Sequence, residues 1–174
     1  MKIHKPKEAP IPINAYATHQ EVIVAAALQS HQFFPHSTIL EIGCGHYSTP
    51  LLSSIAKSQK RDYEIIVKEP TWGKCFASFA TRLHFIGEKN FLGEIDISKV
   101  GLIFIDEDPF SFRLMWLYFA AENKIPIAVC HDAENLDPRL LNFFLNFYPY
   151  VYVHETYFPP TVIFSTADDP KNWF

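Results

Sequence analysis

Four polar residues follow two apolar runs of the chain, and their types are those needed for acid–base chemistry. Asp106 directly follows one apolar run, His131 and Asp132 directly follow another, and Arg113 lies near the start of a helical pattern. A histidine side chain titrates near pH ~6.5, so it accepts a proton at neutral pH more readily than an ordinary carboxylate does. We therefore predict a catalytic group in which His131 is the general base and Asp106, Asp132 and Arg113 surround it. A strand-end histidine bonded only to the backbone is the alternative.

Parallel strands would have to position these four residues. The apolar runs 100–105 and 127–130 are continuous, as is typical of strands buried on both faces of a sheet. In an open parallel sheet, ligands bind beyond the carboxyl ends of the strands. Because the polar residues follow two such ends, we expect them at one edge of the sheet, beside the strand end at Gly43.

The segment 38–50 contains a strand signal, a glycine turn and a helix start in immediate succession. Gly43 and Gly45 turn the chain after a short apolar run, and a glycine lets a ligand approach the backbone closely. We expect Thr49 to cap the following helix, with Pro50 at its first position. A strand, a glycine loop and a helix in this order open many doubly wound domains that bind a cofactor. An ordinary glycine turn is the alternative.

The glycine segment resembles motif I of a known family. The sequence Glu-Ile-Gly-Cys-Gly at 41–45 is similar to that motif in the class I S-adenosylmethionine-dependent methyltransferases. The resemblance implies that S-adenosylmethionine is the cofactor and that Glu41, Gly43, Gly45 and Ser48 belong to its binding site. The chain departs from the common pattern at Tyr47, where a third glycine often lies. Ser48 stands at the third glycine position of the dinucleotide fingerprint, which disfavours a nicotinamide cofactor.

Two further acidic residues follow predicted strands. Glu69 comes after the strand predicted over 63–68, where an acidic side chain can accept hydrogen bonds from ribose hydroxyls. Glu88 follows the short strand predicted over 83–86 and is expected to face the adenine. We assign both residues to the cofactor site. A solvated glutamate is the alternative for Glu69, and for Glu88 the alternative is that a neighbouring backbone group faces the adenine.

The remaining patterns complete an α/β fold. A capping box from Thr18 to Glu21 predicts the start of a first helix that ends before Pro35 and either closes over the cofactor or covers the sheet. A further helix is expected over 136–147, and β-rich runs at its C-terminal side predict a hairpin. The predicted fold class is Rossmann-like and doubly wound, with a mostly parallel sheet, a C-terminal antiparallel hairpin and helices on both faces. Residues 1–15 are expected to form an extended arm, and residues 16–174 a single methyltransferase-like domain.

The resemblance also raises the question of a metal ion. Catechol-type methyltransferases bind Mg²⁺ through oxygen ligands, and Asp106 and Asp132 match two of their three positions. Ala133 stands where the third ligand, an asparagine, would be, although Glu134 is a candidate substitute. Mg²⁺ prefers such all-oxygen sites. With one ligand replaced, we predict no metal site and regard Mg²⁺ as disfavoured.

A second, looser resemblance concerns the methyl acceptor. The region 105–134 is similar to glucuronoxylan-type sugar O-methyltransferases, in a pattern formed by Asp106, Pro109, Arg113, Met115, Tyr118 and the run 131–134. This resemblance implies a small or sugar-like acceptor. It also implies that Arg113 could pair with a substrate carboxylate, because a guanidinium binds carboxylates in a bidentate fashion.

Composition limits the classes of partner. The net charge is −4 and no basic block occurs, so nucleic acid is not expected. No apolar run reaches the roughly 18 residues of a membrane span, and the three cysteines lack C-x-x-C spacing. We expect a cytoplasmic protein that binds a small-molecule substrate, and the oligomeric state remains open. Its predicted activity is methyl transfer to oxygen; a catalytically inactive Rossmann-like binding protein and a nicotinamide-dependent oxidoreductase are the alternatives.

Overall fold

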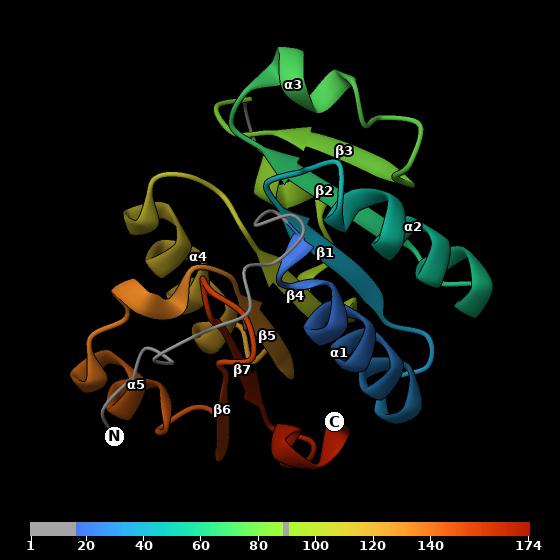
Figure 1. The fold of residues 1–174 in the computed structure, drawn as a ribbon. Helices are drawn as coiled ribbons and strands as arrows, with labels where there is room; N and C mark the ends of the chain where they lie inside the picture. Colours follow the sequence, from blue (N-terminus) through green and yellow to red (C-terminus); the bar gives the residue numbers. More distant parts are fainter. Residues whose placement is uncertain (1–16, 89–90) are drawn as a thin grey trace.

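The computed structural model describes residues 17–88 and 91–174, and the arm predicted at 1–15 lies outside these residues. The described strands form one seven-stranded sheet (Figure 1). The strands are β1 (Thr38–Ile42), β2 (Tyr63–Val67), β3 (Arg82–Phe85), β4 (Val100–Ile105), β5 (Ile127–Cys130), β6 (Tyr150–His154) and β7 (Thr161–Ser165). Their order across the sheet is β3-β2-β1-β4-β5-β7-β6.

The pairing of the strands brings three important strand ends to one edge. β1 pairs in parallel with β2 on one side and with β4 on the other, and β4 pairs in parallel with β5. β7 runs antiparallel to both β5 and β6, so the predicted hairpin is confirmed. Because β1, β4 and β5 are adjacent and parallel, the residues that follow them lie at the same edge of the sheet.

Helices cover both faces of this sheet. They are α1 (Gln20–Phe33), α2 (Ser48–Gln59), α3 (Pro70–Lys74), α4 (Phe110–Glu122) and α5 (Pro138–Phe144). Short 3-10 helices occur at Phe91–Glu94, Ile97–Lys99, Ala133–Asn135 and Pro170–Trp173. In the described ranges 17–88 and 91–174, no helix is both long and apolar enough to cross a membrane.

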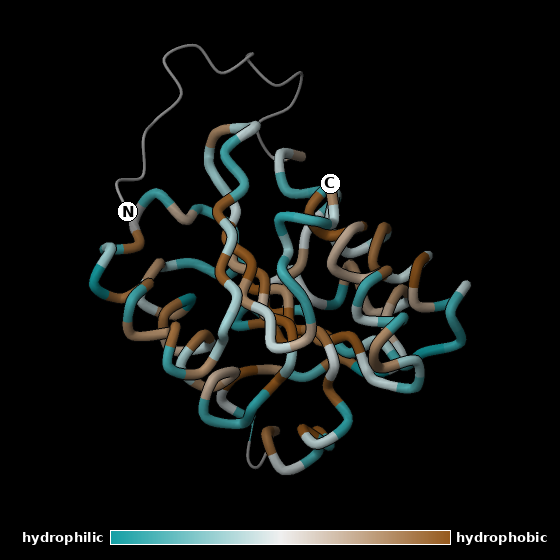
Figure 2. Tube along the Cα trace, turned by 90° about the horizontal axis from the view of Figure 1, so that it is seen from below, coloured by the Kyte–Doolittle hydropathy of each residue, from teal (hydrophilic) through white to brown (hydrophobic). Residues whose placement is uncertain are grey.

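The alternating residues of β4 show how the two layers of helices are held. Ile103 and Ile105 pack in one buried cluster with Trp116 of α4, whereas Phe104 packs in a second cluster with Leu52 of α2. The residues of β4 are buried throughout, which explains why the strand is apolar without alternation. Figure 2 shows hydrophobic residues concentrated in the central strands and hydrophilic residues around them. The predicted doubly wound fold is thus confirmed.

Two predicted helix starts are wrong, for a common reason. α1 begins at Gln20 after His19, and the Thr18 hydroxyl contacts His131 rather than capping the helix. α2 begins at Ser48, and the Thr49 hydroxyl donates a hydrogen bond to a buried carboxylate of β1. In both cases the threonine that the local pattern predicts as a helix cap is hydrogen-bonded to a buried polar residue of another element. Capping therefore yields to tertiary hydrogen bonding.

The start of α5 follows its sequence signal. Asp137 is the N-cap, its side chain accepts a hydrogen bond from the backbone N–H of Arg139, and Pro138 occupies the first turn. The helix ends at Phe144, before the expected limit at Phe147. Local capping is thus realised where no buried partner competes for the side chain.

Candidate functional site

A cavity of about 750 Å³ lies at the edge where β1, β4 and β5 end. The glycine loop after β1 contributes Gly45 and Ser48 to its lining. The turns after β4 and β5 contribute Asp106, His131 and Asp132. The predicted cofactor loop and the predicted catalytic residues therefore line one cavity, as expected from parallel strand ends.

The two glycines of the loop have different roles. Gly45 lines the cavity, and among the described residues a Cβ atom placed on it would meet only the Ser48 hydroxyl, at 3.7 Å. The space beside Gly45 is therefore open to a ligand. Gly43 has a φ of +83°, and a Cβ atom there would clash with the carbonyl oxygen of Asp106. Gly43 thus allows the ends of β1 and β4 to approach each other, and the structure does not place it among the lining residues.

Glu41 lies beneath the glycine loop rather than in the cavity. Its side chain is completely buried, and its carboxylate accepts hydrogen bonds from the hydroxyls of Tyr63 and Thr49, the latter at 2.9 Å. Thr49 in turn accepts a hydrogen bond from the Gly45 N–H at 3.0 Å. Burial raises the pKa of Glu41 to about 7, although these hydroxyls oppose the shift. Glu41 therefore supports the conformation of the loop, and its assignment to the cofactor site stays a prediction.

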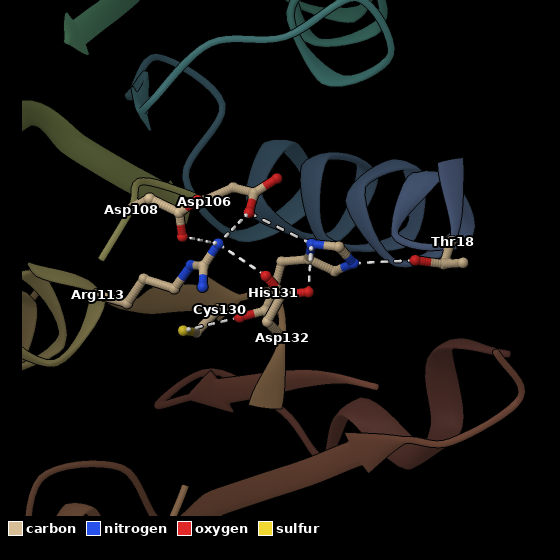
Figure 3. Close-up of polar contacts among 7 residues, drawn as sticks. All are labelled: Thr18, Asp106, Asp108, Arg113, Cys130, His131 and Asp132. Carbon is tan, nitrogen blue, oxygen red and sulfur yellow. Dashed lines mark hydrogen bonds and ion pairs between the residues drawn. The ribbon is translucent and has the colours of Figure 1, made fainter. Parts of the chain in front are cut away.

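Arg113 joins the carboxylates at the rim of the cavity (Figure 3). Its Nη2 atom lies 3.1 Å from Asp106 Oδ1, 3.2 Å from Asp108 Oδ1 and 2.7 Å from Asp132 Oδ2. The Arg113 side chain is only 7% exposed, so its guanidinium makes these contacts largely shielded from solvent. One guanidinium faces three carboxylates, which leaves the rim with an excess of negative charge.

His131 contacts the same carboxylates through one ring nitrogen. Its Nδ1 atom lies 3.3 Å from Asp106 Oδ1 and 3.3 Å from Asp132 Oδ1. Its Nε2 atom lies 2.9 Å from the Thr18 hydroxyl, on the opposite side of the ring (Figure 3). The four predicted rim residues therefore converge in space. Their catalytic role stays a prediction.

The charges of the rim hold two of its members ionised. Burial raises the pKa of Asp106, but the hydrogen bond with His131 and the nearby charges of His131, His19 and Arg113 outweigh it and place the pKa below its ordinary value. Burial lowers the pKa of Arg113, but the neighbouring Asp132, Asp106 and Asp108 raise it further than burial lowers it. A buried ion pair of this kind persists because each charge has an opposite charge in contact.

Glu69 and Glu88 do not line the cavity. Glu69 is the N-cap of α3, where its carboxylate accepts hydrogen bonds from the N–H groups of Thr71, at 3.0 Å, and Trp72. Trp72 itself lines the cavity and donates its indole N–H to the Cys44 carbonyl at 2.8 Å. Glu69 thus holds the turn that carries Trp72. Glu88 is exposed to solvent.

His19 is a cavity residue that the sequence interpretation missed. It is 3% exposed, and its ring centroid lies 4.5 Å from that of His131. It stands in the pattern Thr-His-Gln-Glu, which was interpreted as a helix cap. That interpretation gave His19 itself no function. Only the packing of α1 against β4 and β5 reveals that the residue before the helix faces the strand ends.

Comparison with known proteins gives a likeness in structure only. No family model matches the chain, and no curated protein matches it by sequence. The methyltransferase domain of METTL16 superposes with a TM-score of 0.61 at 14% identity, over 92% of this chain and 74% of that one.

Two further solved structures are similar. Cofactor-bound Rv0187 from MTB has a TM-score of 0.58 at 17% identity, over 92% of this chain and 85% of that one. An O-methyltransferase from Bacillus cereus in complex with SAH has a TM-score of 0.54 at 16% identity, over 91% of this chain and 83% of that one. At these identities the likeness concerns the fold. The chain therefore has the Rossmann-like fold of the class I S-adenosylmethionine-dependent methyltransferases.

Proposed function

We propose that the protein transfers a methyl group from S-adenosylmethionine to an oxygen atom of a small acceptor. The observation that carries this proposal is the single cavity shared by the glycine loop, with Gly45 and Ser48, and by Asp106 and His131. Methyl transfer needs the methyl donor and the acceptor side by side in one site. The residues proposed for the donor and those proposed for the acceptor line this one cavity. The fold shared with cofactor-bound Rv0187 and with an O-methyltransferase in complex with SAH supports the choice of cofactor.

The residues of the glycine loop fit such a cofactor. The space beside Gly45 would be filled by any side chain at that position, and Ser48 begins α2 at the cavity wall. A volume of about 750 Å³ is within the range of sites that bind cofactors and small molecules. When bound, S-adenosylmethionine supplies a methyl group on a sulfonium centre. Gly45, Ser48 and Trp72 would hold and orient it.

The residues at the rim of the cavity are proposed to act on the methyl acceptor. A hydroxyl acceptor loses its proton as the methyl group arrives, and His131 is the group proposed to take that proton. Asp106 and Asp132, on the Nδ1 side of the ring, would stabilise the imidazolium that forms.

The charge of the rim favours a neutral polar acceptor over an acid. The expected pairing of Arg113 with a substrate carboxylate loses its support, because Arg113 Nη2 already contacts three carboxylates of the protein. An acidic acceptor would add a further negative charge to a rim that already has an excess. We therefore infer a hydroxylated acceptor without a carboxylate, and a neutral sugar belongs to this class.

One observation favours the inactive binding protein as second candidate. Both ring nitrogens of His131 already have polar neighbours, with Thr18 on one side and the two aspartates on the other. A general base must bring a free nitrogen to the acceptor proton. If that arrangement is rigid, the protein would bind the cofactor without transferring its methyl group.

Binding and turnover separate these candidates. Calorimetry and thermal unfolding should show that S-adenosylhomocysteine binds and stabilises the protein and that NAD does not. A panel of neutral and acidic hydroxyl compounds, followed by the formation of S-adenosylhomocysteine from S-adenosylmethionine, then tests turnover. Binding without turnover on the whole panel would support the inactive protein, and stabilisation by NAD alone would contradict both candidates.

A further inference from the structure

Three side chains at the rim have the arrangement of a metal site. His19, Asp106 and His131 each offer one ligand atom, and these atoms all lie within 4.8 Å of one another. Two imidazoles and one carboxylate form a donor set that first-row transition metals bind. All three residues line the cavity. The three donors come from three different elements, the turn before α1 and the ends of β4 and β5.

His19 has a buried ring without a hydrogen-bond partner. Both of its ring nitrogens are buried and lack one among the described residues, although the residue is only 3% exposed. Buried polar atoms without partners are uncommon and call for an explanation, such as an ion. A nitrogen of this ring is therefore placed to coordinate an ion together with Asp106 and His131.

The surroundings of His131 match those of a metal-binding histidine. A ligating histidine usually donates the N–H of its other ring nitrogen to an oxygen, which fixes the tautomer and the ring orientation. Thr18 Oγ1 lies 2.9 Å from His131 Nε2 and can accept that hydrogen bond. Nδ1 then carries the lone pair, and it lies on the side of Asp106 Oδ1, at 3.3 Å.

The charge of the rim also favours a cation. Asp106, Asp108 and Asp132 contact the guanidinium of Arg113, so three negative charges meet one positive charge. The two remaining negative charges equal the charge of one divalent cation. Arg113 lies closest to Asp132, at 2.7 Å, which leaves Asp106 as the carboxylate shared with the histidines.

We propose that His19, Asp106 and His131 bind a divalent first-row transition-metal cation at the rim of the cavity. This donor set differs from the all-oxygen set considered for Mg²⁺ from the sequence, and imidazole ligands favour ions such as Zn²⁺ over Mg²⁺. Three protein ligands leave coordination positions open, and these face the cavity. The site is therefore of the kind that binds a further ligand, and it does not depend on the protein being a methyltransferase. Because the metal would occupy His131 Nδ1 and Thr18 contacts Nε2, the general-base role proposed for His131 applies to the metal-free protein.

The test uses the full chain, freed of metal by a chelator that is then removed. Titration with Zn²⁺ by calorimetry should give one tight site, and Mg²⁺ should not compete. Co²⁺ as a coloured probe should give d–d bands without a thiolate charge-transfer band, because no cysteine belongs to the donor set. His19→Ala and His131→Ala should each weaken Zn²⁺ binding at least roughly 100-fold, more than the loss of an outer-shell partner usually does.

A matched control is His154→Ala. His154 is 4% exposed, and within 17–88 and 91–174 its ring nitrogens have no hydrogen-bond partner, although Nε2 lies 3.6 Å from a carboxylate oxygen of Glu21. It lies outside the cluster. It should leave Zn²⁺ affinity unchanged. His19→Asn is the second variant should His19→Ala fail to fold, which circular dichroism without metal reports. Equal Zn²⁺ affinity in a folded His19 variant, or no binding to the unaltered chain, would overturn the proposal. Because no cofactor or acceptor is present, the result is independent of methyl transfer.

Discussion

The Thr18 hydroxyl lies 2.9 Å from His131 Nε2, so the turn before α1 is bonded to the turn after β5. The two residues are separated by 113 positions in the chain, and both are at most 5% exposed. This contact fixes one side of the imidazole, while Asp106 and Asp132 fix the other. The orientation of His131, the candidate base, thus depends on a residue in the turn before α1.

Loss of this contact should lower the stability of the fold. Thr18→Val keeps the shape of the side chain but removes the hydroxyl, which leaves His131 Nε2 buried without that partner. We expect the free energy of unfolding in urea to fall by about 1 kcal/mol. Thr18→Ser, which retains the hydroxyl, should stay close to the unaltered protein. A Thr18→Val protein of undiminished stability would show that the bond contributes nothing.

His131→Ala should lower turnover far more than it lowers cofactor affinity. A general base contributes roughly 10²–10⁴-fold to rate, and His131, which lines the cavity, is the base that we propose. Steady-state kinetics and calorimetry with S-adenosylhomocysteine measure the two effects separately. His46→Ala serves as control, because His46 also lines the cavity but is exposed and outside the rim. Equal rates for the two variants would remove His131 from catalysis.

The two glycines of the loop should respond to alanine in opposite ways. At Gly43 the positive φ and the clash with Asp106 should destabilise the fold, with strain alone on the order of 1–3 kcal/mol. At Gly45 the added methyl group meets only Ser48, so stability should hold while affinity for S-adenosylhomocysteine falls. Urea unfolding and calorimetry on both variants provide the comparison. A Gly45→Ala protein with full affinity would mean that the ligand does not approach the loop there.

Glu41 should make stability depend on pH. Its pKa is about 7 in the folded protein because of burial, against an ordinary value of 4.5, so its favourable contribution is complete below pH 4.5 and is lost as the pH rises to about 7. The loss amounts to about 3 kcal/mol at most. His19 acts in the opposite direction, since burial lowers its pKa from 6.5 to about 4 and its contribution grows as the pH rises through that range.

The contribution of Glu41 is isolated by difference. Glu41→Gln removes the titrating group and leaves His19 in place. The free energy of unfolding of the unaltered protein, minus that of Glu41→Gln, should therefore decline between pH 4.5 and 7 and then level off. A difference that is flat over this range would show that Glu41 has an ordinary pKa.

Glu69 distinguishes a cofactor ligand from a helix cap. Aspartate is a strong N-cap residue, so Glu69→Asp should keep the hydrogen bonds to the turn that carries Trp72 while drawing the carboxylate back. If Glu69 also binds the ribose hydroxyls, as predicted from its strand end, Glu69→Asp should weaken S-adenosylhomocysteine binding roughly tenfold. Unchanged affinity in Glu69→Asp, with a loss in Glu69→Ala, would assign the residue to capping alone.

The strands could be predicted because burial on both faces leaves a continuous apolar run in the sequence. β4 is such a run, and the polar residue after it, Asp106, could be placed at the edge of the sheet by topology alone. The side-chain partners could not be predicted in this way. Thr49 has the sequence of a cap, yet it bonds to Glu41, because a buried carboxylate in the preceding strand needs a donor.

His19 is a clearer example of a residue whose place in the site could not be predicted from the sequence. Its role depends on where α1 packs, and that is set by apolar contacts with strands far along the chain. No spacing in the sequence connects it to His131. The predicted convergence of Asp106, Arg113, His131 and Asp132, in contrast, needed only the parallel order of adjacent strands.

The distance in sequence between Thr18 and His131 also has a consequence for folding kinetics. Contacts between residues so far apart close large loops, and such contacts form late. The rim cannot exist until β4 and β5 have added to β1 and the turn before α1 has reached His131, so the binding site is completed late in folding. A ligand that requires the completed rim should therefore slow unfolding while leaving the folding rate nearly unchanged.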